Sequence, residues 1–131
     1  MFIPHIWHRE PEPWEWQPAA SGLELKVGTA LAFSGGNLVK ATGTTKPEFI
    51  CMEDVTTTEA GQMIHVERVR PETEYETTLS AAPSSGNLAL GSKYTLDANG
   101  EQITATTTSG VATLTYFEGE TVGSKVYVRF V

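Results

Sequence analysis

Apolar and polar residues alternate along this chain over short stretches that are separated by glycine-containing turns. The clearest unit spans residues 27–55: an alternating run with Leu31 and Phe33, a turn at residues 34–37, and a return run with Leu38. The turn reads Ser-Gly-Gly-Asn, and glycine accepts the positive φ that a tight hairpin turn requires. The pattern therefore predicts a β-hairpin, followed by a third apolar strand at residues 49–52.

The last third of the chain has the most regular pattern. Its turn signals are Asn99-Gly100, Ser109-Gly110 and residues 119–123. Between them the sequence predicts four strands, at residues 94–96, 103–107, 111–117 and 125–131.

Residues 22–93 continue the strand pattern less evenly. We expect strands at residues 23–27, 62–69 and 75–79, one helical turn at residues 56–60, and a loop at residues 80–87. Short strands at regular spacing with glycine turns indicate a sandwich or a small barrel. We therefore predict an all-β fold with a single domain over residues 22–131, built from eight to ten mostly antiparallel strands.

Residues 1–21 differ from everything after them. Four prolines fall within this segment, and all three tryptophans of the protein lie here. Proline disfavours both a helix and a central strand, so the segment is predicted to be an extended arm outside the β domain. The Glu-Pro-Glu-Pro run at residues 10–13 favours a polyproline II conformation.

The aromatic side chains of this arm suggest a docking function. Disordered tails normally lack such residues, and tryptophan is enriched at the energetic centres of interfaces. One interpretation is that the rings cap the domain's own core. The other is that the arm contacts a neighbouring subunit or a partner, and the candidate partner-binding residues are then Phe2, Ile6, Trp7, Trp14 and Trp16.

Composition limits the possible partners. The 131 residues carry a formal net charge of −7, whereas nucleic-acid binding depends on clustered lysine and arginine. No apolar run approaches the roughly 18 residues of a membrane span. The amino-terminal segment also lacks a basic region followed by an apolar stretch, so we expect no secretion signal and synthesis in a cytoplasm.

Few residues suggest catalysis or metal binding. Cys51 lies in an apolar run and is interpreted as a small buried hydrophobe. His5 and His8 lack the further ligands that a zinc site needs, and His65 lies between Ile64 and Val66, as on a strand surface.

Acidic side chains are similarly uninformative. Glu72, Glu74 and Glu76 would line one solvated face of a strand, and residues 97–101 contain only a fragment of a calcium loop. No phosphate-binding, nucleophile-elbow or zinc-protease motif is present. We therefore expect no enzymatic activity, no metal and no cofactor.

One part of the chain is similar to a known family. The runs at residues 28–31, 35–41 and 47–51 resemble the head decoration (capsid cement) proteins of tailed bacteriophages, and the likeness extends over about residues 25–69. The resemblance implies a small β-rich, β-tulip-like domain, commonly a homotrimer, on the outer surface of the phage capsid. It would clamp neighbouring subunits of the major capsid protein, with the arm contacting the shell or adding a strand to a capsid edge.

Two other functions are open. A carbohydrate- or surface-binding β-sandwich of a phage tail or spike would stack sugar rings on Trp7, Trp14 and Trp16. The position of these rings on a proline-rich terminus favours the decoration protein instead. The third option is an enzyme whose active-site residues are distant in sequence and meet only in the fold. No sequence feature favours it.

Overall fold

The computed structural model describes residues 1–84 and 86–131, and these residues form twelve strands and no helix. The predicted all-β fold is confirmed, with more strands than the eight to ten expected. Every strand pair is antiparallel except one, β2 with β5. The strands are β1 (Ile3–Ile6), β2 (Trp14–Ala19), β3 (Glu24–Leu25), β4 (Ala30–Ser34), β5 (Asn37–Lys40), β6 (Phe49–Cys51), β7 (Val55–Thr56), β8 (Gln62–Arg68), β9 (Glu74–Thr78), β10 (Lys93–Tyr94), β11 (Ala112–Phe117) and β12 (Lys125–Arg129).

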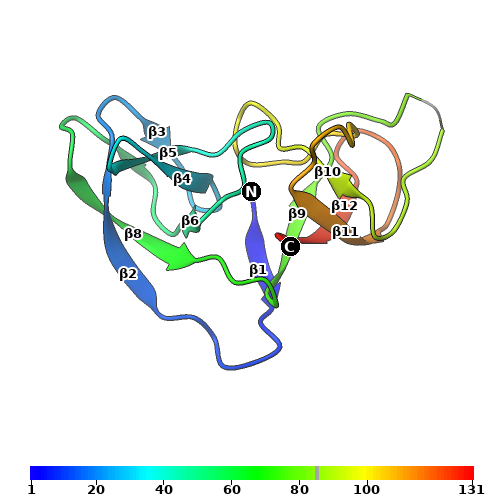
Figure 1. The fold of residues 1–131 in the computed structure, drawn as a ribbon, viewed down its shortest axis with the longest axis horizontal. Helices are drawn as coiled ribbons and strands as arrows, with labels where there is room; N and C mark the ends of the chain where they lie inside the picture. The colour runs from blue at the N-terminus through cyan, green and yellow to red at the C-terminus, as the bar shows by residue number, and fades with distance from the viewer. Residues whose placement is uncertain (85) are drawn as a thin grey trace.

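Five strands close into a small barrel in the order β2-β5-β4-β6-β8 (Figure 1). Alternate side chains point inward because the side-chain period of a strand is two. Its interior is filled by large apolar residues such as Leu31, Phe49 and Ile64, all buried. The short pair β3–β7 lies beside the barrel, and Leu25 of β3 belongs to the same core.

The predicted hairpin is β4–β5. Ser34 pairs with Asn37, so Gly35 and Gly36 form a two-residue turn. Their φ values are +62° and +89°, the region that side chains with a Cβ rarely adopt. Glycine at these positions therefore fixes the register of the hairpin, as the sequence predicted.

The other five strands form an open sheet in the order β1-β9-β12-β11-β10. In β12, Val126 and Val128 are buried, as is Phe130 just after it, whereas Tyr127 and Arg129 lie on the opposite face. The alternation read from the sequence is thus the alternation of a sheet with one covered face.

The barrel and the sheet share a core. Ala30 and Ala32 of β4 and Ile50 of β6 point out of the barrel and pack in the same cluster as Tyr75 and Phe130 of the sheet half. Small side chains on β4 let the two layers approach closely. The Ala30 N–H also donates to the Gly100 carbonyl at 2.7 Å, so a backbone hydrogen bond adds to the shared packing.

The prediction that residues 1–21 form an arm outside the domain is wrong. Residues 3–6 are the edge strand of the open sheet, and residues 14–19 are a strand of the barrel (Figure 1). Proline is tolerated in both because each strand has an unpaired side: β1 is an edge, and β2 meets β5 only at Ala19. The linking residues 7–13 and the ends of the segment, residues 1–2 and 20–21, lie outside these strands.

Smaller differences concern the loops. Residues 103–107 make only isolated bridges, from Ile103 to Leu79 and Leu96, instead of a strand. The helical turn expected at residues 56–60 does not form, since Thr56 belongs to β7. The predicted loop at residues 80–87 includes residue 85, which lies outside the described residues.

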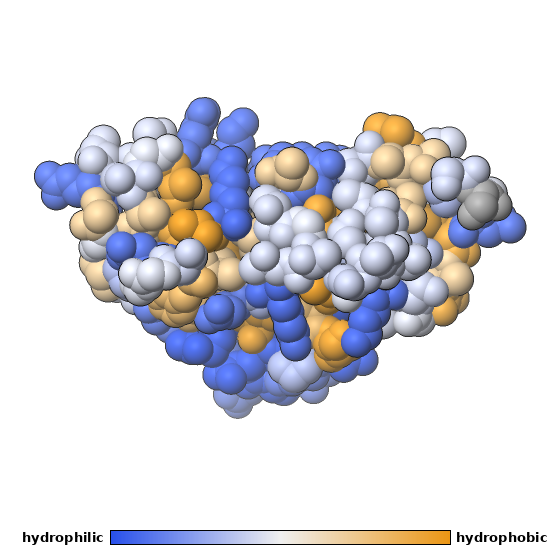
Figure 2. All heavy atoms as spheres, turned by 45° about the horizontal axis from the view of Figure 1, so that its top comes forward, coloured by the Kyte–Doolittle hydropathy of each residue, from blue (hydrophilic) through white to orange (hydrophobic). Residues whose placement is uncertain are grey.

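Apolar side chains on the face shown in Figure 2 form small separate patches among hydrophilic ones. Within residues 1–84 and 86–131 there is no helix of the length and apolarity needed to cross a membrane.

Candidate functional site

The outer side of β2 and β8 carries the most exposed aromatic surface of the barrel. Trp14 and Trp16 are 58% and 54% exposed, and they share one side of β2 because they are two residues apart. The neighbouring strand adds Met63, which is 51% exposed and pairs with Pro18, and His65, which pairs with Trp16. We call Trp14, Trp16, Met63 and His65 the indole face.

Neighbouring groups hold the rings of the indole face in place. The Trp16 and His65 rings stack with centroids 3.7 Å apart and planes 28° apart, and the Trp14 centroid lies 5.9 Å from that of His65. The backbone N–H of His65 donates to the Glu53 carboxylate at 2.7 Å. A surface ordered before binding loses less entropy when a partner covers it.

Trp7 has a partly structural role. It is half-buried, and its indole N–H donates to the Glu67 carboxylate at 3.4 Å. Glu67 is only 2% exposed. Burial raises the pKa of Glu67, and the hydrogen bond from Trp7 offsets part of that increase.

The five predicted partner-binding residues therefore divide into two groups. Trp14, Trp16 and Ile6 are exposed and Trp7 is partly exposed, so they are available for contact. Phe2 is not available for contact with a partner, because its side chain is fully buried and packs edge-on against Phe130 with centroids 5.4 Å apart. Burial of this ring in the chain's own core removes its apolar surface from water, which stabilises the folded protein.

A second aromatic surface lies on the outer face of the open sheet. The Tyr127 ring stacks on His5 at 4.2 Å and on Tyr116 at 4.9 Å between centroids. Sequence reasoning did not identify this surface or the contributions of Met63 and His65 to the indole face. The alternation of β8 and β12 could have indicated part of both surfaces, because Met63 and His65 of β8 and Tyr127 of β12 occupy outward positions.

Cys51 and residues 97–101 lie in the surroundings that the sequence indicated. Cys51 is buried inside the barrel, and burial raises the pKa of its thiol. Residues 97–101 form a turn in which the Asn99 N–H donates to the Asp97 carboxylate at 3.0 Å. In the part of the chain that the structure describes, no three His, Cys, Asp or Glu side chains gather as a metal site would require.

Glu74 and Glu76 lie on the outer face of β9, as the spacing predicted. Glu76 pairs with Lys125 at 3.6 Å, and Glu74 accepts a hydrogen bond from the Thr115 hydroxyl at 2.6 Å. Glu72 precedes the strand and pairs with Arg9 at 2.5 Å. These carboxylates therefore serve local ion pairs and hydrogen bonds.

Comparison of the chain with protein-family models and with curated proteins finds no match. The geometry itself offers a rigid aromatic surface suited to apolar contact and stacking.

Proposed function

We propose that this protein is a structural component of a phage virion, without enzymatic activity, that decorates the outside of the capsid. As a homotrimer, it would clamp neighbouring subunits of the major capsid protein and stabilise the shell. The indole face would be the surface that contacts the capsid.

The observation that carries the proposal is the exposure of Trp14, Trp16 and Met63 side by side on a closed barrel. Each side chain leaves more than half of its surface in water, which is unfavourable unless a partner covers it. Tryptophan in a rigid setting is typical of the residues that dominate binding energy at interfaces.

Two further features support a capsid as the partner. The residues that resemble head decoration proteins form β4, β5 and β6, so the likeness covers a continuous part of the barrel. The net charge of −7 suits a protein that faces outward and does not bind packaged DNA. Symmetric shells also multiply weak contacts, because many copies bind at once.

The test is a binding assay with expanded capsids from particles of the source. The double variant Trp14→Ala, Trp16→Ala should lose binding by at least about 100-fold, since two hot-spot residues are removed. The matched control is Leu90→Ala, Val122→Ala, which removes two exposed apolar side chains elsewhere. Equal binding by both variants would overturn the proposal, and light scattering of the free protein would test the trimer.

A specific observation favours one alternative, a carbohydrate-binding module. Trp14 and Trp16 stand on a barrel strand about 7 Å apart, the spacing of alternate strand residues, which suits stacking on a sugar chain. The proline-rich segment that carries Trp14 and Trp16 is a strand of the barrel, so their position does not disfavour this function. A change in tryptophan fluorescence on titration with a polysaccharide, without affinity for capsids, would favour this alternative.

A further inference from the structure

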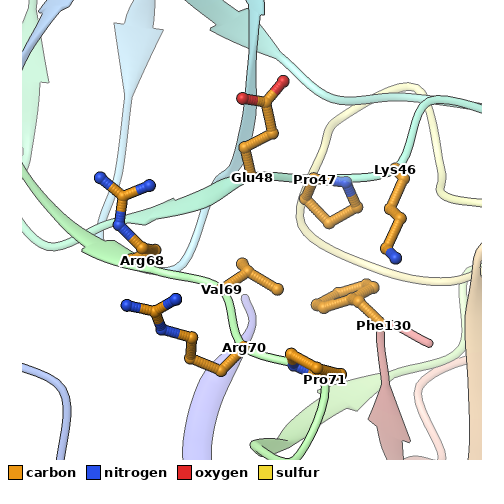
Figure 3. A pocket seen from close by; sticks show the side chains of 8 residues that line it. All are labelled: Lys46, Pro47, Glu48, Arg68, Val69, Arg70, Pro71 and Phe130. Carbon is orange, nitrogen blue, oxygen red and sulfur yellow. The ribbon is translucent and has the colours of Figure 1, made fainter.

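A hollow of about 480 Å³ lies between the barrel and the open sheet (Figure 3), and no residue of the indole face lines it. Its walls come from residues 46–48 before β6, the end of β8 with residues 69–71 after it, and the residue after β12. Three of the nine lysine and arginine residues line it, namely Lys46, Arg68 and Arg70. Such a concentration is unusual in a chain with a net charge of −7.

The two guanidinium groups are fixed from outside the hollow. Arg68 donates to Glu15 through Nη2 at 2.8 Å and Nε at 3.3 Å, and its Cζ lies 4.8 Å from the ring centroid of Phe49. Arg70 donates through Nε to Glu12 at 3.1 Å. Burial opposes ionisation of Glu15, but the hydrogen bonds from Gln17 and Arg68 outweigh it and lower the pKa of that carboxyl.

These pairs leave donors free. An arginine has five N–H groups, and among the described residues neither Nη of Arg70 nor Nη1 of Arg68 donates a hydrogen bond. Lys46 is exposed and has no carboxylate within 4.0 Å among the described residues. The site therefore has charge-assisted donors available for an anionic group.

Glu48, the acidic residue that lines the hollow, does not pair with these donors. Glu48 lines the site, yet its carboxylate points away from Arg70 and Phe130 (Figure 3) and accepts a hydrogen bond from the Phe33 N–H at 3.4 Å. The apolar surface between Lys46 and the arginines comes from Val69, which is partly buried and packs against the core cluster that contains the fully buried Phe130. The hollow thus combines cations at its rim with an apolar base.

We propose that this hollow binds an acidic peptide segment of a partner protein. Carboxylates of the segment would pair with Arg68, Arg70 and Lys46, and an apolar side chain would lie on Val69. A nucleic acid fits less well, because its extended charge would run over the acidic remainder of the surface. A short peptide needs only the local cations, whose N–H groups match carboxylate oxygens.

The experiment is an NMR titration of the isotope-labelled full chain with a capped peptide, Glu-Glu-Phe-Glu-Glu. We expect chemical-shift changes at the residues lining the hollow, suppressed by salt. The matched peptide, Gln-Gln-Phe-Gln-Gln, should produce much smaller changes. Equal changes with both peptides, changes spread over the whole chain, or no changes would overturn the proposal.

Variants test the charge contribution directly. Lys46→Ala should weaken peptide binding about threefold, the size of effect typical of one exposed charge pair. The control Lys93→Ala removes an exposed lysine from β10, outside the hollow, and should leave binding unchanged. Equal affinity of the two variants, or a single-stranded oligonucleotide binding at the hollow as tightly as the acidic peptide, would contradict the proposed ligand class.

Discussion

Phe2 joins the amino terminus to the core at the scale of a single residue. Its ring is fully buried among the sheet residues Tyr75 and Phe130, and its backbone N–H donates to the Gly28 carbonyl at 2.8 Å. The chain therefore holds its first strand both by packing and by a hydrogen bond to the barrel side.

Phe2→Ala should destabilise the protein by about 3–5 kcal/mol, because the substitution removes a buried ring and leaves a cavity. Ile3→Ala is the matched control: Ile3 is 43% exposed, so its truncation should change the free energy of unfolding by about 0.5 kcal/mol. Urea denaturation of both variants provides the measurement. Similar stabilities would show that Phe2 does not belong to the core.

Glu67 is a second residue whose environment has a measurable effect. Its pKa is raised by burial, so the folded chain holds this proton more tightly than the unfolded chain does. As the pH rises from the ordinary glutamate value through the folded value, the unfolded state loses its proton first and the free energy of unfolding falls.

Glu67→Gln should therefore raise the free energy of unfolding at pH 7, because glutamine keeps an acceptor for Trp7 without a buried charge. The gain should shrink as the pH falls toward the ordinary carboxyl value, where wild-type Glu67 is also neutral. Urea denaturation over a series of pH values measures this difference. A gain that is the same at every pH would contradict the predicted linkage.

At the scale of elements, the β4–β5 hairpin depends on backbone conformation at its turn. A Cβ added at Gly35 would meet no atom within 4 Å, so the cost of a substitution there comes from its positive φ alone. Gly35→Val should destabilise the protein by about 1–2 kcal/mol, whereas Gly35→Asn should lie close to wild type, since Asn-Gly suits this turn. Thermal denaturation distinguishes them, and equal losses would contradict the turn assignment.

The elements that the sequence predicted correctly are those with a local signal. The hairpin has two glycines at its turn, and β8, β11 and β12 alternate buried and exposed positions. The two strands before residue 20 were missed because their proline residues disfavour strands in general. Their pairing depends on β8 and β9, more than 40 residues away, and no local pattern encodes which strand edge remains open for a proline.

The candidate site was likewise predictable only where residue type alone indicates it. Trp14 and Trp16 stood out by residue type alone, and their exposure agrees with a docking function. Met63 and His65 join them only through the register of β2 with β8. The hollow lined by Lys46, Arg68 and Arg70 depends on the placement of the barrel against the sheet, which the sequence pattern does not specify.

At the scale of the whole molecule, the shared core predicts a single unfolding transition. All three tryptophans lie at residues 7–16, two of them on the barrel, and all four tyrosines lie on the sheet half, at residues 75–127. Tryptophan fluorescence and the NMR signals of fluorinated tyrosine therefore report different halves. We expect their thermal transitions to coincide, because one cluster of buried residues joins the halves. Separate midpoints would show that the barrel and the sheet unfold independently.

The one cysteine of the chain makes the opening of the closed barrel measurable. Cys51 is enclosed by the barrel strands, so a thiol reagent reaches it only when those strands separate. The rate of thiol modification in native buffer therefore reports on the opening of the barrel, through a thiol that the sequence already contains.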